Sequence, residues 1–147
     1  MAIRKQFLFT CVAIMFGAGF ALGSVLRGTQ VVRGESATRV FELRTYTTPE
    51  GKLDDLQARF RDHTIDLFER HRMTNIGYWT PQDTPSSSNT LIYIIAHNSR
   101  EAAQTNWQNF GNDPEWQRVS RESQLDGRIL NNVESVFLDP TDFSPIQ

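Results

Sequence analysis

The feature that most constrains the fold is a run of seven residues, 90–96 (TLIYIIA), in which nearly every side chain is apolar. The run has the length of a β-strand, and polar residues bound it at Asn89 and at 97–99 (HNS). Successive side chains of a strand point to opposite faces of its sheet, so a continuous apolar run implies two covered faces. We therefore expect this segment to be a central strand, and the rest of the chain must supply its neighbours and its cover.

Three further segments have the character of strands. Residues 39–46 (RVFELRTY) alternate with a period of two, residues 74–80 (TNIGYWT) are rich in aromatic and β-branched side chains, and residues 132–138 (NVESVFL) form a third short run. These patterns predict three more strands.

Two segments have helical periodicity. Between Gly51 and Arg72, apolar residues and one threonine recur at spacings of three and four, as in a helix with one buried stripe. A second helical segment begins after Ser99, breaks at 111–112 (GN) and restarts at Asp113 and Pro114, where an N-cap residue precedes a proline suited to the first turn. The order strand, helix, strand, strand, helix, strand predicts an α+β domain with the ferredoxin-like βαββαβ arrangement.

A four-stranded antiparallel sheet with its helices on one face leaves the other face without cover. The alternation in residues 39–46 suggests that their polar side chains lie on that face, whereas residues 90–96 are apolar on both faces. A second copy of the chain, packed sheet against sheet, would cover it. We therefore predict a homodimer.

The first 26 residues are predicted to direct the localisation of the protein and not to be part of the folded domain. Residues 7–26 carry no charge, and Arg4, Lys5 and Arg27 flank them. This pattern fits a cleaved signal peptide, with 21–23 (ALG) as the processing site, or an uncleaved membrane anchor. Either alternative places the domain on the outer side of the cytoplasmic membrane, secreted or periplasmic or tethered to it. Residues 27–38 are predicted to be a linker, and residues 39–147 the folded domain.

Charge and cysteine content exclude other classes. The 15 basic and 17 acidic residues give a net charge of only −2, so we expect no nucleic-acid partner. The only cysteine, Cys11, lies in the predicted leader, so the domain has no internal disulfide.

Several stretches in the domain, taken in order, resemble the NIPSNAP family. They are 41–46 (FELRTY), the 60–71 segment with HT and LFERH, 77–79 (GYW), Trp107 with 113–116 (DPEW), and 133–138 (VESVFL) with 140–142 (PTD). The resemblance covers about residues 40–144. It implies a dimeric α/β barrel, in which two sheets enclose a central cavity, but no settled reaction.

Two histidines are candidates for proton transfer. Helical counting places His71 near the middle of the apolar stripe of the 51–72 helix and His63 at its edge, so both are expected to point towards the sheet or cleft. An imidazole titrates near neutral pH, which suits a catalytic acid or base. The alternative is a packed histidine whose ring nitrogens are hydrogen-bonded.

A second set of residues is a candidate ligand site. Glu42, Arg44 and Tyr46 share one face of the first strand. If Arg44 binds an anion, tyrosines would donate hydrogen bonds to it; the alternative is a structural ion pair between Arg44 and Glu42. The complete candidate set is Glu42, Arg44, Tyr46, Tyr78, Tyr93 and Glu134.

The sequence lacks the ligand spacings of metal sites, and we expect neither a metal nor a cofactor. Haem held by a helix histidine, as in some barrels of this architecture, remains the alternative. The leading interpretation is a homodimeric module that binds a small apolar or anionic ligand or a protein partner. The alternative is a cofactor-free, monooxygenase-like enzyme that acts on a small apolar substrate in the barrel.

Overall fold

The computed structural model describes residues 39–147. The predicted leader and linker lie outside the described residues. Within residues 39–147, no helix is long and apolar enough to cross a membrane.

Four strands form one antiparallel sheet: β1 (Val40–Thr47), β2 (Thr74–Trp79), β3 (Thr90–His97) and β4 (Asn132–Leu138). Their spatial order is β2-β3-β1-β4, and every neighbouring pair is antiparallel. All four strands were predicted, and the apolar strand β3 lies inside the sheet between β1 and β2, as expected. The order is that of a ferredoxin-like fold.

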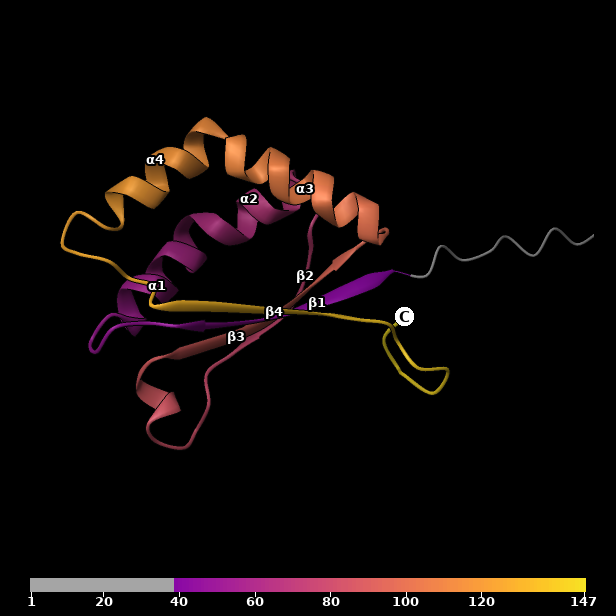
Figure 1. The fold of residues 1–147 in the computed structure, drawn as a ribbon, viewed down its shortest axis with the longest axis horizontal. Helices are drawn as coiled ribbons and strands as arrows, with labels where there is room; N and C mark the ends of the chain where they lie inside the picture. The colour runs from indigo at the N-terminus through magenta and orange to yellow at the C-terminus, as the bar shows by residue number, and fades with distance from the viewer. Residues whose placement is uncertain (1–38) are drawn as a thin grey trace, which may run out of the picture. The chain divides into compact units, whose positions relative to one another are not determined.

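The helices all lie on one side of this sheet (Figure 1). The first predicted helix is present as α1 (Leu53–Arg59) and α2 (Ile65–Arg70), joined by a π-helical turn, η1 (Phe60–Thr64). The second predicted helical segment is present as α3 (Arg100–Asn112) and α4 (Pro114–Glu122). A short 3₁₀ turn, η2 (Ser86–Ser88), precedes β3. The π turn was not predicted, and it lies beside the site described below.

The break between α3 and α4 has the predicted chemistry. The carboxylate of Asp113 accepts hydrogen bonds from the backbone N–H groups of Glu115 and Trp116, at 2.7 and 3.3 Å. Pro114 occupies the first turn of α4, where its missing N–H costs nothing. The hydroxyl of Ser99 likewise accepts from Ala102 N at the start of α3. These caps fix where each helix begins.

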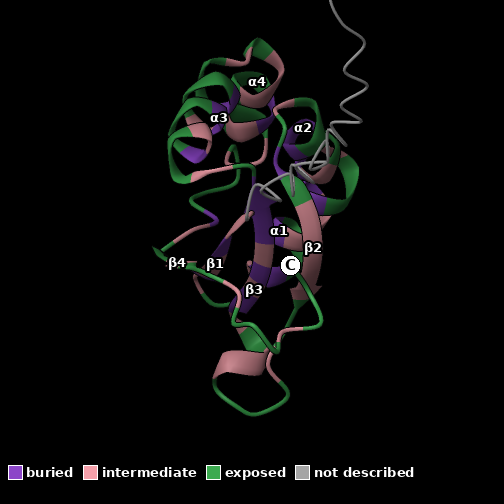
Figure 2. Ribbon diagram, turned by 90° about the vertical axis from the view of Figure 1, so that its right-hand side faces the viewer, coloured by how far each residue is buried: buried purple, intermediate pink, exposed green. Residues whose placement is uncertain are grey.

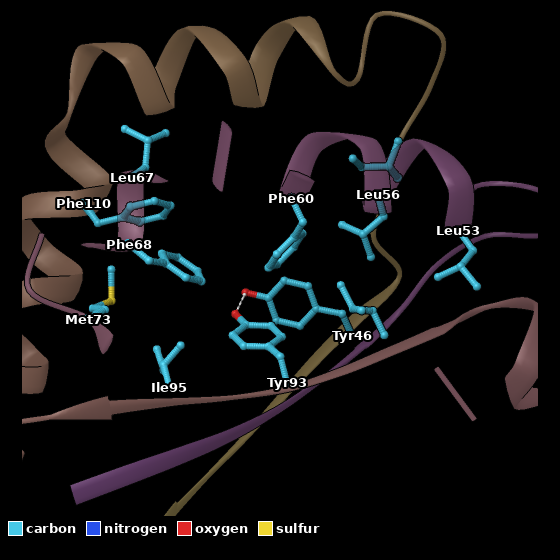
Figure 3. Close-up of a cluster of buried hydrophobic side chains, with 12 residues drawn as sticks. Tyr46, Leu53, Leu56, Phe60, Leu67, Phe68, Met73, Tyr93, Ile95 and Phe110 are labelled. Carbon is cyan, nitrogen blue, oxygen red and sulfur yellow. Dashed lines mark hydrogen bonds between the residues drawn. The ribbon is translucent and has the colours of Figure 1, made fainter. Parts of the chain in front are cut away.

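The core fills the space between the helices and the sheet (Figures 2 and 3). Its centre is aromatic: the ring of Phe60 lies edge-on to the rings of Tyr46, Phe68 and Tyr93, with centroids 5.2 to 6.0 Å apart. Full burial of one such large side chain contributes about 2 kcal/mol. Packing rather than covalent cross-links therefore holds the described domain together.

The other face of the sheet is covered only in part. The C-terminal tail packs near one end of it, where Pro140 and Ile146 border a groove with Phe41 and Ile94. Elsewhere on this face Trp79 is 51% exposed and Val136 53%. The described domain thus presents an open, largely apolar sheet face, which we call the open face.

Candidate functional site

The polar face of β1 points towards the helices, not towards the open face. Glu42, Arg44 and Tyr46 pair with Ile95, Tyr93 and Leu91 of β3, all on the helix-covered side, whereas Phe41 and Leu43 lie on the open face. The expectation that the polar side chains of this strand lie on the open face was therefore wrong. Alternation separates the two faces but does not say which one the helices cover. Here the aromatic ring of Tyr46 and the stem of Arg44 join the core.

Glu42 is the centre of a buried polar network. It is 1% exposed, and its two oxygens accept from Trp107 Nε1 at 2.7 Å and from Ser135 Oγ at 2.6 Å. Arg44 Nη1 lies 2.6 Å from the same carboxylate. The ion pair between Glu42 and Arg44 that the sequence offered as an alternative is therefore present within the chain.

His97 belongs to the same network, and its tautomer follows from its partners. Asn106 Nδ2 donates to the backbone oxygen of Arg72 and also lies 3.2 Å from His97 Nδ1. Because an amide nitrogen can only donate, Nδ1 of His97 accepts, and Nε2 carries the ring proton. His97 Nε2 donates that proton to Glu42 at 3.1 Å. The network thus contains a neutral imidazole and an ionised carboxylate.

Burial alone would raise the pKa of Glu42. The hydrogen bonds from His97, Ser135 and Trp107 and the charge of Arg44 outweigh it and lower the pKa from 4.5 to about 2. Glu42 is therefore a permanent acceptor near neutral pH. A group with so low a pKa is a poor general base, and its arrangement suits a structural role.

The tyrosines of the candidate set lie together in the core. Tyr93 donates a hydrogen bond to the hydroxyl oxygen of Tyr46 at 2.9 Å (Figure 3). Tyr78 stacks on Tyr93 with centroids 5.4 Å apart and donates to Asn75. Burial raises the pKa of both Tyr78 and Tyr93, so both remain protonated. Among the described residues, no group accepts the proton of Tyr46.

A partly enclosed cavity of about 110 Å³ lies beside Tyr46, between α4, the π turn and the sheet. Five of its ten lining residues are aromatic, and four others have polar side chains. Its lining residues are Tyr46, Arg59, Phe60, Thr64, Phe68, Phe110, Trp116, Ser120, Gln124 and Leu130. An apolar pocket with a few convergent polar groups is the usual form of a small-molecule site.

Arg59 is the charged group of this cavity. The residue is 4% exposed, and its guanidinium carbon lies 5.1 Å from the centre of the Trp116 ring. Its position at the end of α1, immediately before the widened π turn, brings both Arg59 and Phe60 inwards. π turns are frequent at functional sites.

The candidate histidines lie elsewhere. His71 ends α2, and its Nε2 is 2.7 Å from Asp113 Oδ2, so it links the end of α2 to the cap of α4. His63 lines a polar surface groove between α1 and α4. Neither histidine is among the residues that line the 110 Å³ cavity.

Glu134, the remaining member of the candidate set, does not lie with Glu42. It pairs with Thr45 and lies on the open face, exposed, whereas Ser135 faces the helices and reaches Glu42. A shift of one residue along a strand reverses the face.

Sequence reasoning missed Arg59 and the partners of Glu42. Arg59 lies three residues after Leu56 on the buried stripe of the helix, and a charged residue at such a position is a signal that could have been read. His97 follows Tyr93 and Ile95 at intervals of two, which places it on the same covered face. Trp107 and Ser135 gave no such signal, because only the tertiary fold brings them to Glu42.

Residues 39–147 thus form an α+β domain of the ferredoxin-like class, with a pocket beneath its helices. The NIPSNAP family profile matches residues 41–145. The chain belongs to the NIPSNAP family.

Solved structures agree with this assignment at the level of the fold. A NIPSNAP family protein of unknown function from Agrobacterium tumefaciens is 22% identical, with a TM-score of 0.65, over 76% of this chain and 96% of that one. A NIPSNAP domain protein from Burkholderia xenovorans is 23% identical, with a TM-score of 0.61, over 72% and 98%. No curated protein matches the chain.

Proposed function

We propose that this NIPSNAP domain is a homodimeric module that binds a small organic molecule, on the outer side of the cytoplasmic membrane. The observation that carries the proposal is the 110 Å³ cavity between α4 and the sheet, with its aromatic wall and its buried guanidinium. Rings supply contact area for an apolar body, and the few polar groups fix its orientation.

Binding is favoured over catalysis by what lines the cavity. A monooxygenase-like reaction needs a group that accepts or donates a proton at the substrate. The titratable side chains lining the cavity are Tyr46 and Arg59, and neither His63 nor His71 is among them. Glu42, the buried carboxylate, has its oxygens engaged by protein donors. This lining supports binding as the proposed function over a reaction in the cavity.

A cavity-filling variant tests the proposal. Ser120 lies on α4 and borders the cavity, so Ser120→Leu places a larger apolar side chain into it. Gln117→Leu, on the exposed side of the same helix, is the matched control. In a screen of small organic molecules against the full chain, we expect ligands of the wild type to bind Gln117→Leu with the same affinity. The same ligands should not bind Ser120→Leu. Ligands that bind all three proteins equally would refute the site.

The open face supports the homodimer. Val136 and Leu138 of β4 are 53% and 38% exposed on it, and Leu43, Ile92 and Ile94 are half-buried beside them. Contiguous apolar surface of this kind marks an interaction site. A second copy of the same sheet, packed face to face, would bury it.

The sequence of residues 1–26 supports the proposed location. An uncharged run of twenty residues between basic flanks directs export or anchors the chain. The mass of the mature protein purified from its source separates the two forms. A mass lacking the first 23 residues indicates cleavage, the full mass with membrane association indicates an anchor, and the full mass in the cytosolic fraction would contradict export.

A further inference from the structure

We propose that the ligand of the 110 Å³ cavity is a short organic carboxylate, and that Arg59 binds its carboxylate group. The inference rests on the proposed ligand-binding function and names the chemical class of the ligand.

Arg59 lacks a counter-charge within the described domain. Among residues 39–147, no carboxylate lies within 4.0 Å of its guanidinium, and its buried Nε has no hydrogen-bond partner. Its one side-chain hydrogen bond within the described domain is from Nη1 to Ser123 Oγ, at 3.5 Å. Arg44 is also largely buried and its Nε too lacks a hydrogen-bond partner, but the carboxylate of Glu42 lies 2.6 Å from its Nη1 and supplies the counter-charge that Arg59 lacks.

A buried cation without a partner is unfavourable. Burial accordingly lowers the pKa of Arg59. On its other side Arg59 borders the surface groove, whose carboxylates are those of Asp55, Asp62, Glu122 and Asp126. None of these carboxylates forms an ion pair with Arg59. An anion in the cavity would supply the missing charge.

The cavity offers a carboxylate a further hydrogen-bond donor beside Arg59. The planar guanidinium matches a carboxylate through two parallel hydrogen bonds. Tyr46 already accepts from Tyr93, so its own proton is available to an acceptor in the cavity. One anion could thus receive donors from Arg59 and Tyr46.

The size and the lining of the cavity limit the body of the ligand. The rings of Phe60, Phe110 and Trp116 line the cavity, and the ring centroids of Phe110 and Trp116 are 4.3 Å apart. An apolar cavity of roughly 150 Å³ takes benzene, so one of about 110 Å³ fits a shorter body. A carboxylate with a short aliphatic tail satisfies both the charge and the volume.

The test compares butyrate with butyramide, which has the same shape without the charge. Binding to the full chain is followed by NMR through the indole N–H signal of Trp116, with the signal of Trp79, on the open face, as internal reference. We expect butyrate to bind about tenfold more tightly than butyramide. In Arg59→Met that preference should disappear, and in Ser120→Leu both compounds should lose binding.

The outcomes separate this inference from the proposed function. Equal binding of the two compounds to the wild type, lost in Ser120→Leu, would overturn the carboxylate but leave the ligand cavity in place. A butyrate preference that persists in Arg59→Met would overturn the role of Arg59. Binding of neither compound would overturn this ligand class, and the screen with Ser120→Leu would still decide the cavity itself.

Discussion

Single residues carry most of the electrostatics of this domain, and Glu42 is the clearest case. Its folded pKa of about 2 lies below the ordinary 4.5, so its ionised form stabilises the fold above about pH 5, and that stabilisation is lost as the pH falls towards 2. We predict that Glu42→Gln lowers the free energy of unfolding by about 3 kcal/mol at pH 7. The variant should also lose less stability than the wild type as the pH falls from about 5 towards 2. Urea unfolding between pH 2 and 7 measures both effects.

Glu50→Gln, on an exposed turn, is the control for this experiment and should lose as much stability on acidification as the wild type does. If Glu42→Gln retained the same loss of stability on acidification as the wild type, the pH dependence would come from other carboxylates.

Substitution of Arg59 should stabilise the domain, whereas substitution of Glu42 should destabilise it. Because its charge is buried without a counter-ion in the described domain, Arg59→Met should raise the free energy of unfolding by about 1 kcal/mol while weakening carboxylate binding. Thermal unfolding without added ligand measures the effect. Arg61→Met, an exposed neighbour, should change stability by less than about 0.5 kcal/mol. A clear loss of stability in Arg59→Met would mean that Arg59 serves the fold through Trp116 and Ser123.

For single residues, the sequence indicates the pairing of Glu42 with Arg44 but not the hydrogen-bond partners that Glu42 has on other elements. The need of Glu42 for Arg44 follows from their spacing on one strand, and the structure confirms the pair. The choice of face does not follow, because either face of β1 contains enough apolar surface to be covered. Trp107 and Ser135 are 65 and 93 residues from Glu42 in the chain, and nothing local links them to it.

At the scale of elements, the junction of α2, α3 and α4 depends on Asp113. Its carboxylate caps α4 and contacts His71, and the contact with His71 lowers the pKa of Asp113. We predict that Asp113→Ala destabilises the domain by about 1 kcal/mol or more through loss of the cap. Asp113→Asn keeps a capping oxygen and should cost less. Equal losses in the two variants, measured by urea unfolding, would assign the effect to His71 instead.

The elements themselves were the most predictable part of the molecule. Each of the four strands falls within about one residue of its predicted bounds, because period-two alternation and a long apolar run are local signals. Asp113 and Pro114 marked the start of α4 for the same reason. The π turn was not predicted from the sequence, because the apolar stripe of residues 53–67 continues across it with spacings that an ordinary α-helix also satisfies.

At the scale of the whole molecule, the open face makes the oligomeric state testable. We predict that the wild type is a dimer and that Val136→Lys, on the open face, weakens dimerisation at least about tenfold, because a charge would be buried in the interface. Val133→Lys is the matched control, since Val133 lies on the same strand but on the helix side. Sedimentation velocity across a concentration series measures both. A wild type that stays monomeric at micromolar concentration would remove the dimer.

We place the ligand site inside a single chain, beneath α4, and not between two sheets. A crystal structure of the chain purified from its native source and grown with butyrate decides between these positions. We expect density for a small carboxylate in contact with Arg59 and beside Trp116 and Ser120. Density bound against the open face, with the space beside Arg59 closed by protein side chains, would contradict it.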